Sequence, residues 1–159
     1  MSNTPNRASN PAPKPRRKDA AIDLDTARAM LPLVRGILTD VRNQSRRLGE
    51  LLPEQERLER HRRELTWAER TRRYAIQDEI TASEKGLAAA TAELEGLGVT
   101  LVDAAAGEVD FPARVNGRSA AYHYVAGEPT LGHWHYTGDD VLRPIPDDWQ
   151  TGTPVRSRT

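Results

Sequence analysis

The 159-residue sequence contains no cysteine. Disulfides, thiolate metal ligands and thiol nucleophiles are therefore excluded, and we expect a reducing, cytoplasmic environment. It also lacks any apolar run near the roughly 18 to 20 residues that a membrane span needs, and it lacks the apolar core of a signal peptide. The 23 basic and 23 acidic side chains cancel, so no net field steers the protein to nucleic acid or anionic lipid. These absences favour a soluble cytoplasmic protein without a membrane partner.

The signature motifs of common enzymes are missing as well. The sequence has no phosphate-binding GxxxxGK[ST] loop, no complete GxGxxG, no HExxH and no GxSxG. A protein that is not an enzyme is therefore favoured. The enzyme question stays open, because an unfamiliar active site need not use any of these motifs.

Both ends of the chain are polar. Residues 1–21 mix Pro, Asn and Ser with a basic cluster from Lys14 to Lys18, and we expect a disordered basic tail. Short basic tails are more often solvated than bound to phosphates, so nucleic-acid binding through this tail is not favoured. We expect residues 147–159 to form a loose C-terminal tail, which leaves 22–146 as one domain.

Two amphipathic stripes indicate two helices within residues 22–98. Asp23 is placed to cap the first helix, and Gly98 can end the second in a left-handed conformation with Val99 touching Leu94. Both stripes recur at alternating steps of four and three residues, which is typical of a coiled-coil seam. The first consists of Ala27, Leu31, Val34, Leu38, Val41, Ser45, Leu48 and Leu52, and the second of Ile76, Ile80, Ser83, Leu87, Ala90, Leu94 and Leu97. The pattern predicts a long antiparallel helical hairpin.

A charged segment, residues 53–74, separates the two stripes. Its Glu and Arg residues recur at helical spacing, but a continuous helix from Glu54 to Leu97 would be about 65 Å long, against about 42 Å for the first helix. A break or an overhang is therefore needed, and we expect a bend near Trp67 to Thr71. The favoured interpretation of the charges is a solvated face. The alternative is a surface for a second copy of the protein, carried by Leu58, Leu65, Trp67 and Tyr74.

After Gly98 the hydrophobic period changes to two residues, which is typical of strands. Asn116-Gly117 predicts a hairpin turn, and Gly127-Glu128-Pro129 indicates another reversal. We therefore expect an α+β fold in which residues 99–146 form a small antiparallel β-meander of three to four strands on one end of the helices. The expected strands are Val99–Val102, Val109–Val115, Ala120–Val125 and Thr130–Tyr136.

The stretch GHWHYTG, residues 132–138, raises the question of a metal site. On a strand His133 and His135 point to one face and Trp134 to the other, and the pairing register decides which face His123 joins. The favoured interpretation packs Trp134 on the helices and leaves the histidines half-exposed, so no cofactor is expected. The alternative is a divalent metal such as zinc, held by histidines at 123, 133 and 135 with a nearby carboxylate.

Several motifs occur in a characteristic order between residues 22 and 145. They are DLDTARAMLPLV, LEGLGVTLVD, GEVDFPARVNGR, a GEP turn and a closing WH. Together they resemble the uncharacterised prokaryotic family called domain of unknown function 2203, and this resemblance implies no known activity. The matching positions are Asp110, Phe111, Pro112, Gly117, Arg118, Gly127, Glu128, Trp134 and His135.

The resemblance favours a polar site that differs from a histidine pair. His133 stands where the family usually has an aromatic residue and His123 where it often has cysteine, so a metal pair of these two would not be shared by the family. An arginine flanked by carboxylates could bind a small anion, and a nearby imidazole could shuttle a proton. An ion-pair network that fixes the hairpins is the favoured alternative. The candidate polar site consists of Asp110, Arg118, Glu128 and His135.

Three functional hypotheses follow from these patterns. The favoured one is an interaction or scaffold protein, whose helical hairpin forms a homo-oligomer or holds a protein partner. The alternative is a small ligand- or metal-binding module, or an enzyme, with a polar site on the β-meander. Nucleic-acid binding through the basic tail ranks third.

Overall fold

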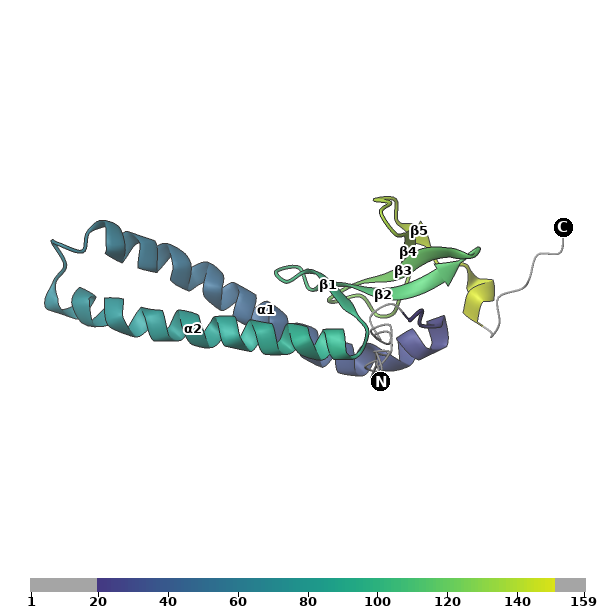
Figure 1. Cartoon of the computed structure of the whole chain (residues 1–159), viewed down its shortest axis with the longest axis horizontal. Coiled ribbons are helices and arrows are strands. Elements are labelled where there is room, and N and C mark those ends of the chain that lie inside the picture. The colour runs from purple at the N-terminus through teal and green to yellow at the C-terminus, as the bar shows by residue number, and fades with distance from the viewer. Residues whose placement is uncertain (1–19, 151–159) are drawn as a thin grey trace, which may run out of the picture.

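The computed structural model describes residues 20–150, which form an elongated α+β structure (Figure 1). Helices α1 (Leu24–Arg60) and α2 (Trp67–Gly96) pack antiparallel as a long hairpin, and an antiparallel sheet lies against one end of it. The sheet order follows the chain order, as in a meander. Its strands are β1 (Thr100–Asp103), β2 (Glu108–Val115), β3 (Arg118–Val125), β4 (His133–Tyr136) and β5 (Arg143–Pro144). The predicted class is confirmed, with β5 as one strand more than expected.

The C-terminal end of the described chain differs from the expectation. The predicted basic tail up to residue 19, with its Lys14 to Lys18 cluster, and the residues from 151 onward lie outside the described part. Residues 147–150, expected to be loose, form the short 3-10 helix η2. Trp149 in η2 packs against Trp134 with ring centroids 5.3 Å apart, which explains why this turn is held on the core. No helix within residues 20–150 is long and apolar enough to cross a bilayer.

Helix α1 begins at its predicted cap, where the Asp23 carboxylate accepts a hydrogen bond of 2.8 Å from the backbone N–H of Thr26. The first half of the predicted stripe is buried, but after Leu48 the stripe shifts by one residue. Leu51 is 1% exposed, whereas the predicted Leu52 is 45% exposed. Leu51 lies seven residues before the buried Leu58, so this shift keeps the stripe facing α2 along the rest of the helix.

The break between the helices lies at residues 61–66, and the prediction of a bend near Trp67 to Thr71 is wrong. α2 starts at a capping box. The Thr66 hydroxyl accepts from the Glu69 N–H at 3.3 Å, and the Glu69 carboxylate accepts from the Thr66 N–H at 2.9 Å. The charged segment is therefore divided between helices of 37 and 30 residues, which removes the length mismatch that a single long helix would create.

Buried side chains form two separate clusters. The larger cluster lies where both helices meet the sheet, and it includes Val34, Leu94, Phe111 and Trp134. The smaller cluster lies farther along the hairpin and consists of Leu51, Leu58, Leu65, Ile76 and Ile80. The part of the hairpin that projects from the sheet therefore has a hydrophobic core of its own (Figure 1).

Two tight turns set the geometry of the sheet. Gly98 has a φ of 81°, and the Val99 N–H donates to the Leu94 carbonyl at 3.0 Å, which confirms the predicted ending of α2. Asn116 and Gly117 have φ values of 52° and 73°, as a two-residue hairpin turn requires.

Strand pairing then divides the residues of the sheet between two faces. Phe111 pairs with Tyr122, and Tyr122 pairs with Trp134. All three belong to the larger core, so this row faces the helices, and the prediction that Trp134 packs on them is confirmed. Alternation along each strand turns the neighbouring residues to the outer face.

Candidate functional site

The strand register places polar side chains from three strands on the outer face of the sheet. Asp110 in β2 lies directly opposite His123 in β3, and His123 lies directly opposite His133 in β4. His135 shares this face because it lies two residues beyond His133. His123 therefore joins the histidine face, which settles the register that the sequence left open.

Asp110, His123 and His135, called the Asp110 cluster from here on, are in direct contact. The Asp110 carboxylate lies between the two imidazoles, with Oδ1 2.9 Å from His123 Nδ1 and Oδ2 3.0 Å from His135 Nε2. The two rings are 6.0 Å apart and steeply inclined to each other. His123 is 9% exposed, and the side chains of Asp110 and His135 are 20% and 16% exposed. The cluster is thus mostly shielded but still reachable from solvent.

The environment of His135 favours its charged form. Its Nδ1 lies 2.9 Å from the carbonyl oxygen of Tyr136, and its Nε2 faces Asp110. Burial is the largest single influence on the ring and acts to lower its pKa, but the hydrogen bonds to Asp110 and Tyr136 together outweigh it, so the pKa of His135 is raised. Both ring nitrogens face acceptors, and both can donate only when the ring is protonated.

His123 is oriented by carboxylates on both sides. Its Nδ1 faces Asp110, and its Nε2 lies 3.8 Å from a carboxylate oxygen of Glu108. The nitrogen and oxygen atoms that the Asp110 cluster could offer to one cation lie within 4.8 Å of one another. Such an arrangement can share protons or hold a cation between the side chains. His133, the third histidine of the metal alternative, is exposed and lies outside this cluster.

The four residues of the predicted polar site lie in three separate places. Asp110 and His135 contact each other, whereas the Arg118 guanidinium lies 4.0 Å from the centre of the Tyr136 ring. Arg118 is five residues before His123 on the same strand, and this odd spacing turns it to the opposite face of the sheet. Arg118 therefore does not share the outer face with the Asp110 cluster.

Glu128 belongs to the turn after β3. Its carboxylate accepts from the Val125 N–H at 3.2 Å, and its carbonyl oxygen accepts from the Tyr124 hydroxyl at 3.0 Å. Arg35 of α1 donates to the same hydroxyl at 3.0 Å and to the carbonyl of Pro129. These bonds fasten the turn to α1 beside an open groove of about 490 Å³. Glu128 therefore fixes the conformation of the turn after β3.

The match to known families covers most of the described structure. A family model described as an uncharacterized conserved protein, DUF2203, matches residues 21–141. The chain belongs to the DUF2203 family. The matched range includes both helices and the whole Asp110 cluster and stops before β5. Searches of curated proteins and of solved structures give no match.

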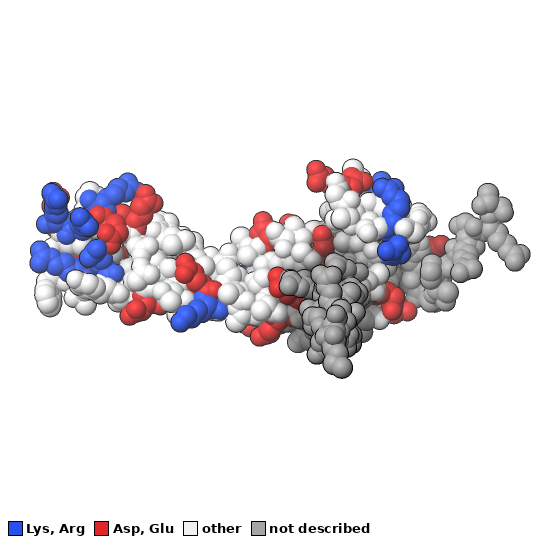
Figure 2. All heavy atoms as spheres, in the orientation of Figure 1, with Lys and Arg blue, Asp and Glu red and all other residues white. Residues whose placement is uncertain are grey.

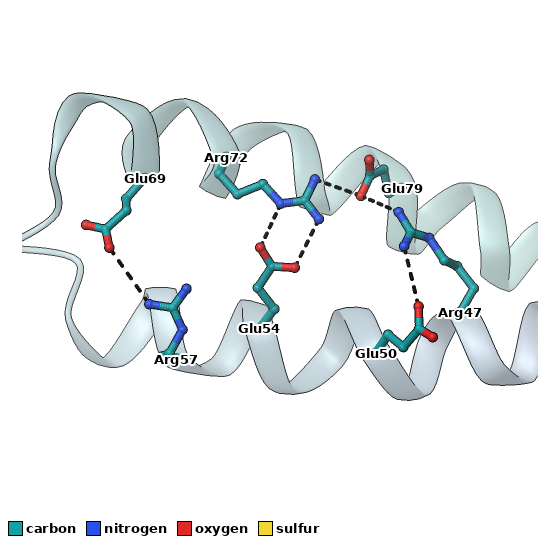
Figure 3. A network of polar contacts seen from close by, with 7 residues as sticks. All are labelled: Arg47, Glu50, Glu54, Arg57, Glu69, Arg72 and Glu79. Atoms are coloured by element: carbon teal, nitrogen blue, oxygen red, sulfur yellow. Dashed lines mark hydrogen bonds and ion pairs between the residues drawn. The ribbon is translucent and has the colours of Figure 1, made fainter.

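A second candidate site on the DUF2203 chain is the hairpin end, defined here as residues 54–74. Basic and acidic side chains gather there, far from the sheet (Figure 2). Figure 3 shows the ion pairs that join the two helices. Arg72 makes a bidentate contact with Glu54 at 2.7 and 3.0 Å, and it also contacts Glu79 at 2.9 Å. These side chains are about one-third exposed, so the pairs orient the helices more than they stabilise them.

The ion pairs leave part of the positive charge uncompensated. Within residues 20–150, Arg62, Arg63 and Arg70 have no carboxylate in ion-pair distance, and all three are exposed. Arg62 and Arg63 lie in the loop between the helices, and Arg70 lies in the first turns of α2. Glu64 in the same loop forms no ion pair with a described residue either, and the charge of Arg62 acts on Glu59. The tip of the hairpin is still basic, because residues 54–74 contain seven arginines and five glutamates.

The apolar residues expected on this surface have different positions. Leu58 and Leu65 are 0% and 5% exposed, so they belong to the small core and cannot contact a partner. Trp67 and Tyr74 are 82% and 73% exposed. Trp67, Arg70 and Tyr74 follow one another at steps of three and four residues and therefore share one face of α2. This face, called the Trp67 stripe from here on, is the exposed aromatic surface of the hairpin end.

Proposed function

We propose that this DUF2203 chain is an interaction protein that uses its hairpin end to hold an acidic surface of a protein partner. The observation that carries the proposal is the Trp67 stripe, in which two aromatic side chains more than 70% exposed flank an unpaired arginine. Aromatic residues and arginine are enriched in protein interfaces, and tryptophan, tyrosine and arginine dominate their binding energy.

The construction of the hairpin end supports a contact role. The small core beneath it holds the Trp67 stripe on a regular helix, so little conformational entropy is lost on binding. The guanidinium groups of Arg62, Arg63 and Arg70, which form no ion pair with a described residue, favour an acidic partner over a neutral one, because opposite charges guide association. The hairpin also carries this surface away from the sheet, which leaves it accessible (Figure 1).

A photo-crosslinking amino acid at position 67, introduced in the organism that makes the protein, tests the proposal. Position 102 is the matched control, since Val102 is 51% exposed but lies on β1. We expect an adduct from position 67 and none from position 102, and mass spectrometry should locate the crosslink in an acidic segment of another protein. Reversing three charges with R62E, R63E and R70E should reduce the yield at least about tenfold.

Three results would contradict this function. They are the absence of an adduct from position 67, an equal adduct from position 102, and a yield that the charge reversal leaves unchanged. An adduct made of two copies of this chain would replace the acidic partner with self-association. The sedimentation coefficient of the purified chain would then increase with protein concentration.

A further inference from the structure

The Asp110 cluster combines side chains that are suited to a metal ion. One carboxylate and two imidazoles are a common donor set for zinc and other divalent transition metals. They come from three adjacent strands, β2, β3 and β4, so backbone hydrogen bonds on both sides of β3 fix their relative positions. Their donor atoms already lie within 4.8 Å of one another. Small side-chain rotations could therefore bring all three onto one ion.

The orientation of His135 leaves one nitrogen available for a metal. Its Nδ1 lies 2.9 Å from the Tyr136 carbonyl, which can only accept a hydrogen bond, so Nδ1 carries a proton. Its Nε2 points to Asp110 and can lose its proton to a metal. Histidines that bind metals usually donate their other N–H to a carbonyl or a carboxylate in this way, which fixes the ring and raises its basicity.

His123 is oriented in a similar way, but its two ring nitrogens have the opposite roles. Its Nδ1 points to Asp110 at 2.9 Å, and its Nε2 lies 3.8 Å from Glu108. Glu108 is too distant for a hydrogen bond, but its negative charge on the outer side of the ring favours a proton on Nε2 and leaves Nδ1 as the ligand. Both imidazoles therefore direct their available nitrogen to the same carboxylate.

We propose that Asp110, His123 and His135 bind one divalent transition metal ion, with Zn²⁺ as the reference ion. Three protein ligands leave a tetrahedral ion one position for water or a solute, and the partial exposure of the cluster allows exchange there. Glu108 acts as a positioning residue, because its carboxylate reaches the ion only through the His123 ring. In the metal-bound protein the ion takes the place of the two hydrogen bonds that join Asp110 to the imidazoles.

The competing explanation is a purely structural network, in which Asp110 accepts from both imidazoles and no metal binds. Metal titration separates the two. His133 provides the control, since it is a histidine on the same face of the same strand as His135 but lies outside the cluster.

Isothermal titration calorimetry of Zn²⁺ into the full-length, tag-free chain, after removal of metal by a chelator, tests the proposal. We expect saturable binding of one ion per chain. D110N, H123Q and H135Q should each weaken binding at least about tenfold, and H133Q should leave it within about twofold. The absence of saturable binding, or a binding site lost in H133Q and kept in the three cluster variants, would overturn it.

A second measurement covers the case in which a cluster variant fails to fold. Imidazole ¹⁵N chemical shifts of the wild-type chain report which ring nitrogen meets an added metal. On addition of Zn²⁺ we expect large shifts at Nδ1 of His123 and at Nε2 of His135, with His133 and His61 unchanged. Shifts confined to His133 or His61 would show that the ion binds elsewhere and contradict the assignment.

Discussion

The sheet end and the hairpin end of the molecule use polar side chains in opposite ways. At the sheet end a few polar groups are mostly shielded and are fixed by strand pairing, as in the Asp110 cluster. At the hairpin end many charged groups are exposed and are joined by ion pairs within and between the helices (Figure 3). Fixed and shielded groups suit the binding of a small ion, whereas exposed groups on a rigid rod suit contact with a large partner. This difference is the reason that we assign the two proposed roles to separate ends of the chain.

The largest expected loss of stability comes from truncating a buried leucine in either of the two hydrophobic clusters. Leu94 and Leu58 are both fully buried, the first in the larger cluster and the second in the hairpin end. Truncating either to alanine should reduce the free energy of unfolding of its surroundings by about 2 to 5 kcal/mol. Leu94→Ala should weaken the whole domain, whereas Leu58→Ala should weaken mainly the hairpin end, because the small core is a cluster separate from the one beneath the sheet.

Amide hydrogen exchange measures where each substitution acts. Leu58→Ala should accelerate exchange in residues 48–80 and leave β2 and β3 close to wild type. Equal acceleration in the sheet and the hairpin for both variants would mean that the chain unfolds as one unit, and the division into two regions would be wrong.

A smaller effect is expected at the start of α2. Thr66→Ala removes the capping box and should cost about 1 kcal/mol of stability, again confined to the hairpin end. Thr71→Ala is the matched control, because the Thr71 hydroxyl bonds only the Trp67 carbonyl within the same helix. Chemical denaturation should give the control a change below about 0.5 kcal/mol. Equal losses of stability in both variants would show that the capping box does not stabilise the start of α2.

Acid should loosen the hairpin end before the sheet. Hydrogen bonds from Arg72 lower the pKa of Glu54, those from Arg73 lower the pKa of Glu59, and the backbone of Thr66 lowers the pKa of Glu69. A lowered folded-state pKa gives stability that is present above the ordinary value of 4.5 and is lost as the pH falls through the folded value.

Amide exchange of residues 54–74 should therefore accelerate relative to β3 below pH 4.5. The effect should be small, since these groups are exposed and screened. Relative protection that stays constant from pH 7 to about pH 3 would contradict the assigned role of the ion pairs.

The smallest effect on stability is expected at Trp67. Trp67→Ser removes an aromatic ring that is 82% exposed, so the unfolding free energy should change by less than about 0.5 kcal/mol. Trp134→Ser, at a position 6% exposed in the larger core, should cost several times more. Thermal denaturation of the two variants checks the contrast. If Trp67→Ser reduced the unfolding free energy as much as Trp134→Ser, the Trp67 stripe would have a packing role.

Local signals allowed much of the fold to be predicted. The four-three stripes identified both helices, and Asp23 and Gly98 marked two of their ends through capping geometry. The break between the helices was misplaced because the signal Thr66-x-x-Glu69 was not recognised. Leu51 and Leu52 could not be distinguished by pattern, since both are leucines and only contact with α2 decides which one is buried.

The candidate site was less predictable because it depends on register between strands. The two-residue turn at Asn116-Gly117 sets Val115 opposite Arg118, and counting back from it places Asp110 opposite His123. This part of the Asp110 cluster could have been derived from the sequence. The pairing that brings His135 beside Asp110 crosses a longer turn after β3, whose geometry no local signal fixes.

Amide hydrogen exchange across residues 20–150, with and without one equivalent of Zn²⁺, tests the division of roles most directly. We expect slower exchange in β2, β3 and β4, where the Asp110 cluster lies, and unchanged exchange in the hairpin end. Slower exchange at the hairpin end alone, or no change anywhere at saturating Zn²⁺, would contradict it.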